Sequence, residues 1–203
     1  LVVLAGLFAA IDAAISTGED EIVLGTREGW AIHFKESDVR AMGRGAHGVC
    51  GMDLRGDDLV VDMAVIRPGL SVLTVCENGF GKRTGVEEYR LTRRGGKGVI
   101  NIKASERNGR VVAVKAVQDD DEMMIITHSG IMLRTGLEQV REIGRATQGV
   151  RLIRPGEGDR VVAVARIAKD VDAGNESEQA ATAEDTSESA IESQEPPTES
   201  TDT

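Results

Sequence analysis

Short apolar, β-branched runs alternate along this chain with glycine-containing polar turns. The clearest runs are EIVLGT, SVLTVC and MMIIT, at residues 21–26, 71–76 and 123–127. Each run leads into a Glu-Gly, Asn-Gly or Ser-Gly turn and then a second run, at residues 30–34, 80–84 and 131–135. Apolar runs on both sides of an Asn-Gly-type turn are typical of β-hairpins. The pattern predicts three hairpins, and no helix longer than two turns after Ser16.

Each predicted hairpin is followed by a polar segment about one helical turn long and then by an Arg/Gly-rich stretch. Two further predicted strands complete each unit, at residues 49–54 and 59–66, then 99–104 and 110–117, then 150–154 and 160–167. Four strands per fifty residues describe one blade of a radial all-β array. We therefore expect an all-β, bladed fold of about three and a half four-stranded blades. The expected boundaries are 1–20 (the end of a preceding blade, with its last strand at 9–16), 21–66, 67–117 and 118–169.

The fifty-residue period also carries charge. The landmark glycines are 50 and 51 residues apart, at Gly29, Gly79 and Gly130 and again at Gly48, Gly98 and Gly149. Two arginines recur in this register, as Arg40, Arg90 and Arg141 and as Arg44, Arg94 and Arg145. A cation repeated with the period of the fold forms a stripe of positive potential. Such a stripe predicts binding of a long anion.

Overall composition hides this basic stripe. All 24 lysines and arginines lie at or before Lys169, whereas residues 170–203 hold eleven of the 34 acids and no base. The net charge of −10 is thus a property of the last 34 residues, and residues 1–169 are near +1. Residues 170–203 are rich in Glu, Ser, Thr and Ala, so we expect a disordered acidic tail.

No residue pattern indicates catalysis or a resident metal. His33, His47 and His128 lack ligand-type spacing, and Tyr89 stands where the sibling repeats have valine, which indicates packing. His33 stands where the siblings have arginine, so we expect a surface polar group. Cys50 and Cys76 are expected to be buried free thiols. The apolar first fifteen residues are too short to span a bilayer, and the missing initial Met suggests that the natural N-terminus lies upstream.

The Arg/Gly stretches suit phosphate oxygens, because glycine lets backbone approach a ligand and arginine binds phosphate through a fork of donors. The densest stretch is TRRGGKG at residues 92–98. Aromatic residues make up 2% of the chain, too few for the stacking platforms of single-strand and RNA binders. Duplex DNA, bound through its backbone and bent, is therefore the expected partner. The candidate DNA-binding residues are Arg40, Arg44, Lys82, Arg83, Arg90, Arg93, Arg94, Lys97, Arg134, Arg141 and Arg145.

The sequence itself resembles a known family. The stretches DEIVLGTREGWAIHFKESDVRAMGRGAHGV, ENGFGKRTGVEEYRLTRRGGKGV and HSGIMLRTGLEQVREIGRATQGVRLIRPGEGDRVVAVARI are similar to the C-terminal domain of the bacterial DNA gyrase A subunit, over about residues 9–169. The resemblance implies a β-pinwheel, usually six-bladed, in which neighbouring blades exchange a strand and DNA wraps around a basic rim. It implies a cytoplasmic, nucleoid-associated type II topoisomerase of A and B subunits that introduces negative supercoils. Its cleavage tyrosine, magnesium-binding carboxylates and ATP site would all lie outside this chain, which needs no cofactor of its own.

One departure from the family bears on these residues. The family's wrapping signature reads QRRGGKG and lies in an early blade, whereas TRRGGKG has Thr92 for Gln and sits in the second-to-last repeat. We interpret it as a sibling of that signature, with the signature itself upstream of Leu1. Two alternatives stay open: the A-type subunit of topoisomerase IV, and a propeller that binds proteins and uses its arginines in loop salt bridges.

Overall fold

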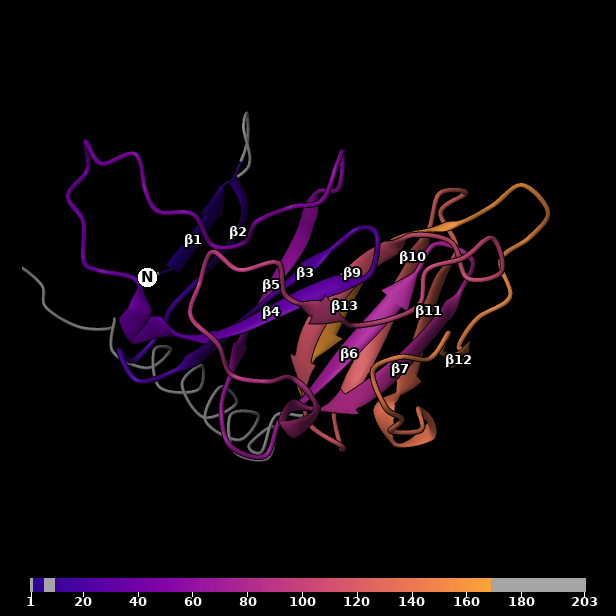
Figure 1. Cartoon of the computed structure of the whole chain (residues 1–203). Coiled ribbons are helices and arrows are strands. Elements are labelled where there is room, and N and C mark those ends of the chain that lie inside the picture. Colours follow the sequence, from indigo (N-terminus) through magenta and orange to yellow (C-terminus); the bar gives the residue numbers. More distant parts are fainter. Residues whose placement is uncertain (1, 6–9, 169–203) are drawn as a thin grey trace, which may run out of the picture. The chain divides into compact units, whose positions relative to one another are not determined.

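The structure, a computed structural model, describes residues 2–5 and 10–168, with side chains from residue 12 onward (Figure 1). This part of the chain is all β apart from three single-turn 3-10 helices, η1 (Glu36–Asp38), η2 (Val86–Glu88) and η3 (Leu137–Gln139). These turns stand where the sequence predicts one-turn polar segments. None of the helices in the described residues is long and apolar enough to cross a membrane.

The strands form four antiparallel sheets. The first has the order β5 (Val60–Ile66), β3 (Glu21–Thr26), β4 (Trp30–Lys35) and β8 (Val99–Ile100). The second has the order β12 (Val150–Arg151), β7 (Phe80–Gly85), β6 (Ser71–Cys76) and β9 (Val111–Val117). The third has the order β11 (Met132–Gly136), β10 (Glu122–Thr127) and β13 (Val161–Ile167). A two-stranded sheet of β1 (Val2–Ala5) and β2 (Ala10–Ala14) precedes them. The predicted all-β, bladed fold is confirmed.

Neighbouring repeats exchange a strand, as the family resemblance implies. β8 comes from the second repeat but pairs with β4 of the first, with Trp30 opposite Ile100. β12 comes from the third repeat and pairs with β7 of the second in the same register, with Phe80 opposite Arg151. Each complete blade therefore contains three strands of its own repeat and one strand of the next, and the exchanged strand ties successive blades together.

The repeated hairpin glycines have a structural cause. Gly79 has φ = +76°, the left-handed region that side chains disfavour. Its carbonyl accepts the backbone N–H of Leu152, 2.9 Å away, as the chain leaves exchanged strand β12. A Cβ atom at Gly79 would lie 2.3 Å from the carbonyl oxygen of Ile153. The turn and the strand exchange both require glycine here.

One predicted strand is absent. Residues 49–54 form no strand, and the equivalent strands β8 and β12 have two residues each, fewer than predicted. β8 and β12 each pair with the second strand of the preceding repeat, and the described residues contain no such partner for 49–54. The segment contacts the next repeat instead: Gly95 N–H donates to the Gly51 carbonyl at 2.7 Å, and Asp53 N–H to the Gly96 carbonyl at 3.0 Å.

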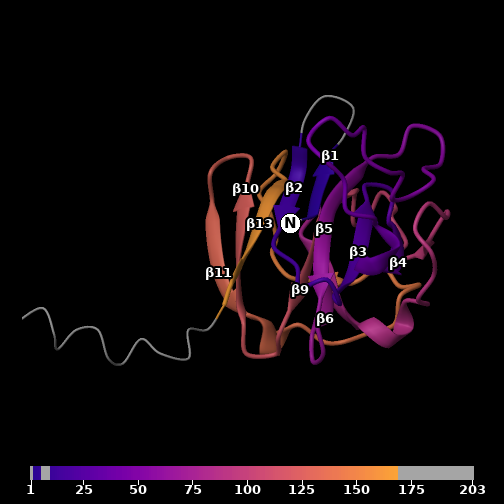
Figure 2. The ribbon, with the colours of Figure 1, turned by 90° about the vertical axis from the view of Figure 1, so that its left-hand side faces the viewer.

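The sheets pack face to face, with β9 of the second sheet lying against β5 of the first and β13 of the third (Figures 1 and 2). One apolar core lies between the first and second sheets and includes Val23, Val72 and Val114. Another lies between the second and third and includes Leu73, Ile125 and Val164. The middle sheet is thus covered on both faces, and every residue of β6 and β7 is buried.

The two cysteines differ. Cys76 is buried, and the pKa of its thiol is raised to about 12, mainly because burial removes the thiolate from water. Cys50 is exposed, so the prediction of a buried thiol is wrong at this position. It lies in the 49–54 segment, which lacks the strand pairing that would have covered it. The predicted acidic tail at 170–203 lies outside the described residues.

Candidate nucleic-acid interface

The three Arg/Gly stretches form equivalent loops at residues 39–48, 89–98 and 140–149. Each begins after a 3-10 turn, and the last two lie along the outer side of the preceding repeat's second strand. Thr92 N–H donates to the His33 carbonyl of β4 at 2.8 Å, and Ile143 N–H donates to the Arg83 carbonyl of β7 at 2.9 Å. These hydrogen bonds repeat in register and place the basic loops on the exchanged-strand side of their sheets.

Six of the candidate cations are exposed and make neither a hydrogen bond nor an ion pair within the described residues. They are Arg40, Arg44, Arg90, Arg93, Lys97 and Arg141. All six lie in the three equivalent loops. Since surface arginines that serve folding usually pair with a carboxylate or carbonyl, six uncommitted cations in register remain available to an external anion.

Arg90, Arg93 and Lys97 also line a cavity of about 250 Å³ between the 90–99 stretch and β4. Thr92, Gly96, Gly98 and Val99 complete the loop side of this cavity. Three cationic side chains, a hydroxyl-bearing residue and glycine backbone around one small space suit a phosphate group.

Arg94 and Arg145 have a different use. The Arg94 side chain donates to the carbonyls of Asp38, at 2.9 Å, and Cys50, at 3.0 Å. Arg145 donates to the carbonyl of Ile100, the position equivalent to Cys50, at 2.9 Å. Both side chains are half-buried. These arginines therefore bind the loops 89–98 and 140–149 to the preceding repeat, and only part of each guanidinium faces solvent.

Lys82 and Arg83 are not surface cations, which corrects the expectation that they bind DNA. Lys82 has no exposed surface, and its Nζ donates to Thr84 Oγ1 at 2.8 Å and to the carbonyls of Gly144 and Arg145 at 3.0 and 2.9 Å. Desolvation, with a smaller contribution from Arg145, lowers the pKa of Lys82 to about 8. Arg83 is buried too, bonded to the Val140 carbonyl at 2.9 Å and ion-paired with Asp119. Both side chains therefore form contacts between the second and third repeats.

His33 is likewise buried, not a surface group as predicted. Its Nδ1 lies 2.9 Å from the carbonyl of Tyr89, and its Nε2 lies 2.8 Å from Glu21 Oε2. Arg83 contacts the equivalent carbonyl in the next pair of repeats, so this position forms an inter-blade hydrogen bond. Arg134, the third sibling, is exposed but is paired with Glu122, with Nε 2.6 Å from Oε2. The predicted packing role of Tyr89 is confirmed, because this residue is buried and its hydroxyl donates to Asn101 Oδ1 at 2.6 Å.

The aromatic rings of Trp30 and Phe80, at the starts of β4 and β7, are already covered by arginine side chains. The Arg55 guanidinium lies 3.3 Å from the Trp30 ring centroid. Phe80 is contacted by Arg107 and Arg151, at 4.7 and 4.5 Å from its centroid. The sequence gives no sign of these pairs, since the partners are 25 or more residues apart. Cation–π pairing leaves neither ring free as a base platform, which favours backbone recognition over single-strand stacking.

The described residues contain no group of three His, Cys, Asp or Glu side chains that could hold a metal ion.

Comparison with known proteins accounts for the repeat. The profile of the family described as DNA gyrase C-terminal domain, beta-propeller, matches three times, at residues 20–67, 71–118 and 121–168. The chain belongs to this family. Each match of the gyrase C-terminal domain family covers one of the three fifty-residue repeats.

Individual relatives agree with this assignment. The chain is 46% identical over 162 residues to the DNA gyrase A subunit of Salmonella typhimurium, covering 80% of this chain and 18% of that protein. It is 43% identical over 177 residues to the DNA gyrase A subunit of Staphylococcus aureus, covering 86% of this chain and 20% of that protein. The chain thus spans about a fifth of the length of these gyrase relatives.

Solved structures with the same fold include the C-terminal domain of DNA topoisomerase IV and that of DNA gyrase A. The topoisomerase IV domain has a TM-score of 0.74 at 26% identity, covering 78% of this chain and 50% of that chain. The gyrase A domain has a TM-score of 0.70 at 31% identity, covering 74% of this chain and 51% of that chain.

Proposed function

We propose that this chain is the duplex-DNA-binding and wrapping domain of a DNA gyrase A subunit. The observation that carries the proposal is the set of six exposed, uncommitted cations that recur in register on the loops 39–48, 89–98 and 140–149. A duplex that follows these loops from blade to blade would meet cations at a regular interval. Contacts between these cations and its phosphates would offset the free-energy cost of bending the DNA. Membership of the gyrase C-terminal domain family supports the same conclusion.

In the whole enzyme, the chain would act together with the rest of the gyrase A protein and with its B-type partner. The wrapped segment would be presented for strand passage, and the ATP-driven enzyme would introduce negative supercoils. We place catalysis, magnesium and ATP on parts outside this chain, and the enzyme in the cytoplasm with the nucleoid. The corresponding domain of a topoisomerase IV is the second candidate, favoured by the TM-score of 0.74 to that enzyme's C-terminal domain.

Bending tests the wrapping proposal directly. A duplex of about 40 base pairs, well below the ~150-base-pair persistence length of DNA, carries a donor and an acceptor dye at its two ends. Energy transfer is expected to rise as the protein binds. Binding without a rise in transfer would leave DNA binding but contradict wrapping. Absence of duplex binding would contradict both and favour a protein-interaction propeller.

Two adjacent arginines provide a matched pair of variants. Arg93 is exposed and uncommitted, so Arg93→Ala is expected to weaken all duplex sequences alike and to reduce the salt slope of log K by about one unit. Arg94→Ala removes two hydrogen bonds to carbonyls, so we expect it also to lower the free energy of unfolding by about 2 kcal/mol. Chemical denaturation and fluorescence anisotropy measure the two effects. Equal stability of the two variants would contradict the inter-repeat contacts assigned to Arg94.

The acidic tail is expected to compete with DNA. Eleven negative charges, covalently linked to a domain that carries cationic loops, would act as a polyanion at high effective concentration, and salt would screen them as it screens DNA. Deleting residues 170–203 should tighten duplex binding at about 50 mM salt and have less effect at about 200 mM, where the Debye length is shorter. Anisotropy titrations at both salts check this, and unchanged affinity at both would leave the tail only a solubilising role.

A further inference from the structure

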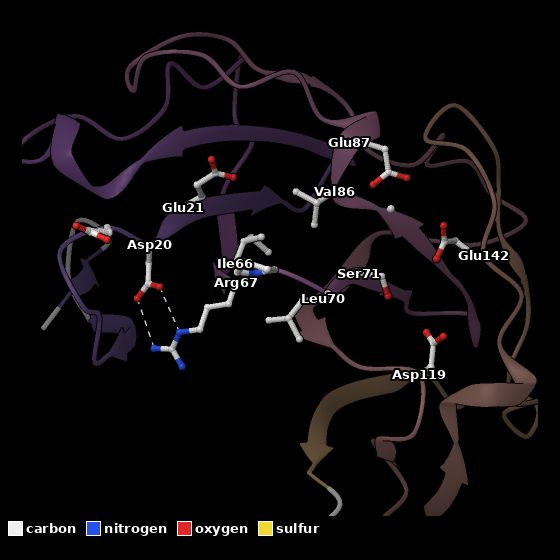
Figure 3. A pocket seen from close by; sticks show the side chains of 14 residues that line it. Asp20, Glu21, Ile66, Arg67, Leu70, Ser71, Val86, Glu87, Asp119 and Glu142 are labelled. Carbon is white, nitrogen blue, oxygen red and sulfur yellow. Dashed lines mark hydrogen bonds and ion pairs between the residues drawn. The ribbon is translucent and has the colours of Figure 1, made fainter.

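A second surface of the described blades is acidic. A cleft of about 550 Å³, which we call the acidic cleft, lies where Glu19–Glu21, the Ile66–Ser71 turn, Gly85–Glu87, Asp119 and Glu142 meet (Figure 3). Its walls come from all three repeats. Six of the lining residues are carboxylates and one, Arg67, is a cation.

Three of these carboxylates already have a side-chain partner. Asp20 is paired with Arg67, and the hydrogen bond from Arg67 is the main reason why the pKa of Asp20 is below its usual value. Glu21 contacts His33, and Asp119 contacts Arg83. The other three, Glu19, Glu87 and Glu142, are exposed and have no cationic partner among the described residues. Three uncompensated carboxylates facing one concave space attract a cation.

Ser71 gives an independent indication of a missing ligand. It stands where the sibling repeats have Glu21 and Glu122, which bond to the side chains of His33 and Arg134. Because serine is too short for this contact, Arg83 instead pairs with Asp119. Ser71 is only 6% exposed, and its hydroxyl has no hydrogen-bond partner in the described structure. Figure 3 shows its hydroxyl directed to the side of the cleft on which Asp119 and Glu142 lie. Buried hydroxyls are usually satisfied, so this one is left for a donor from outside the chain.

The shape and lining of the cleft select the kind of cation. No three carboxylates in the described residues converge closely enough to hold a metal ion. The carboxylates are instead spread over three repeats, and aliphatic side chains of Ile66, Leu70 and Val86 lie between them. Separated anions with apolar surface between them match separated ammonium groups joined by methylene chains. We propose that the acidic cleft binds a linear alkyl polyammonium ion of the polyamine class, with Ser71 accepting an ammonium N–H.

The cleft predicts site-specific binding of spermidine by the full chain without DNA. With ionic strength held constant, the methyl NMR signals of Leu70 and Val86 are expected to shift saturably, whereas those of Leu54 and Leu59, which do not line the cleft, stay in place. Magnesium at equal ionic strength is expected to leave all four unchanged. Equal shifts with magnesium would mean a general cation atmosphere and would overturn the proposal.

Matched variants separate the cleft from the acidic tail, which could also attract spermidine. Glu87→Gln with Glu142→Gln is expected to weaken binding about tenfold, since two charge contacts are lost. The control, Glu106→Gln with Glu157→Gln, alters two exposed acids outside the cleft by the same net charge and should leave the affinity unchanged. Ser71→Ala is expected to weaken binding about threefold, because the ammonium group loses its hydroxyl acceptor. Equal affinities in the two double variants, or no loss in Ser71→Ala, would overturn the assignment.

Discussion

Raising monovalent salt from about 50 to 200 mM is expected to lower the affinity of this domain for duplex DNA about a thousandfold. Each phosphate neutralised by a cation releases counterions and contributes about −0.9 to the slope of log K against log salt. The six uncommitted cations Arg40, Arg44, Arg90, Arg93, Lys97 and Arg141 therefore predict a slope of about −5. Anisotropy titrations of one labelled duplex at four or more salt concentrations measure it.

The buried cations serve as the control for this slope. Lys82 has no exposed surface and cannot reach a phosphate without unfolding. If Lys82 and Arg83 were DNA contacts, as their sequence context suggests, the slope would approach about −7. A slope near −5 that Arg141→Ala reduces by one unit supports the exposed set. A slope shallower than about −2 would show that the loops bind something other than a phosphate backbone.

The strands could be predicted from the sequence because their signals are local. β-branched runs next to turn glycines predicted β3 and β6 with the boundaries that the structure shows, Glu21–Thr26 and Ser71–Cys76. The predicted strand at 49–54 failed because a two-residue exchanged strand exists only through its partner in another repeat. Local propensity carries no information about that partner.

Side-chain exposure could not be predicted from local pattern. The run Phe80–Gly85 contains lysine, arginine and threonine and looks like a solvated strand, yet all six residues are buried. Its polar side chains bond to carbonyls of the 140–149 loop, which comes from the next repeat. Alignment of the repeats does indicate that Lys82 is buried. Lys82 aligns with Ile32 and Leu133, so two siblings have aliphatic residues at that position, and Ile32 is buried. A charge that replaces an aliphatic residue in register indicates a buried hydrogen-bonding role.

Removing that buried charge is expected to have the largest effect on stability. Lys82→Ala leaves a void and deprives Thr84 Oγ1 and the carbonyls of Gly144 and Arg145 of their donor, at a cost of ~3 kcal/mol. Lys82→Leu fills the space as in the sibling repeats and is expected to cost about half as much. Urea denaturation of both variants at pH 7 measures this difference. Wild-type stability in Lys82→Ala would mean that the side chain is exposed after all.

The pH dependence of the stability difference between wild type and Lys82→Leu tests whether the Lys82 ammonium is buried. The pKa of Lys82 is lowered to about 8 in the folded state, from a usual 10.5. Between these values the unfolded chain binds more protons, so this group makes stability rise with pH. Cys76 acts in the opposite direction, because its pKa is raised from 9.0 to about 12 and the folded state keeps the thiol proton longer. Comparing wild type with Lys82→Leu cancels most of the Cys76 contribution, since both proteins contain that thiol and Lys82 is only the last of the causes that shift its pKa. The stability difference in favour of wild type is therefore expected to grow by about 2 kcal/mol from pH 7.5 to pH 10. A difference that stays constant over this range would contradict a desolvated Lys82 ammonium.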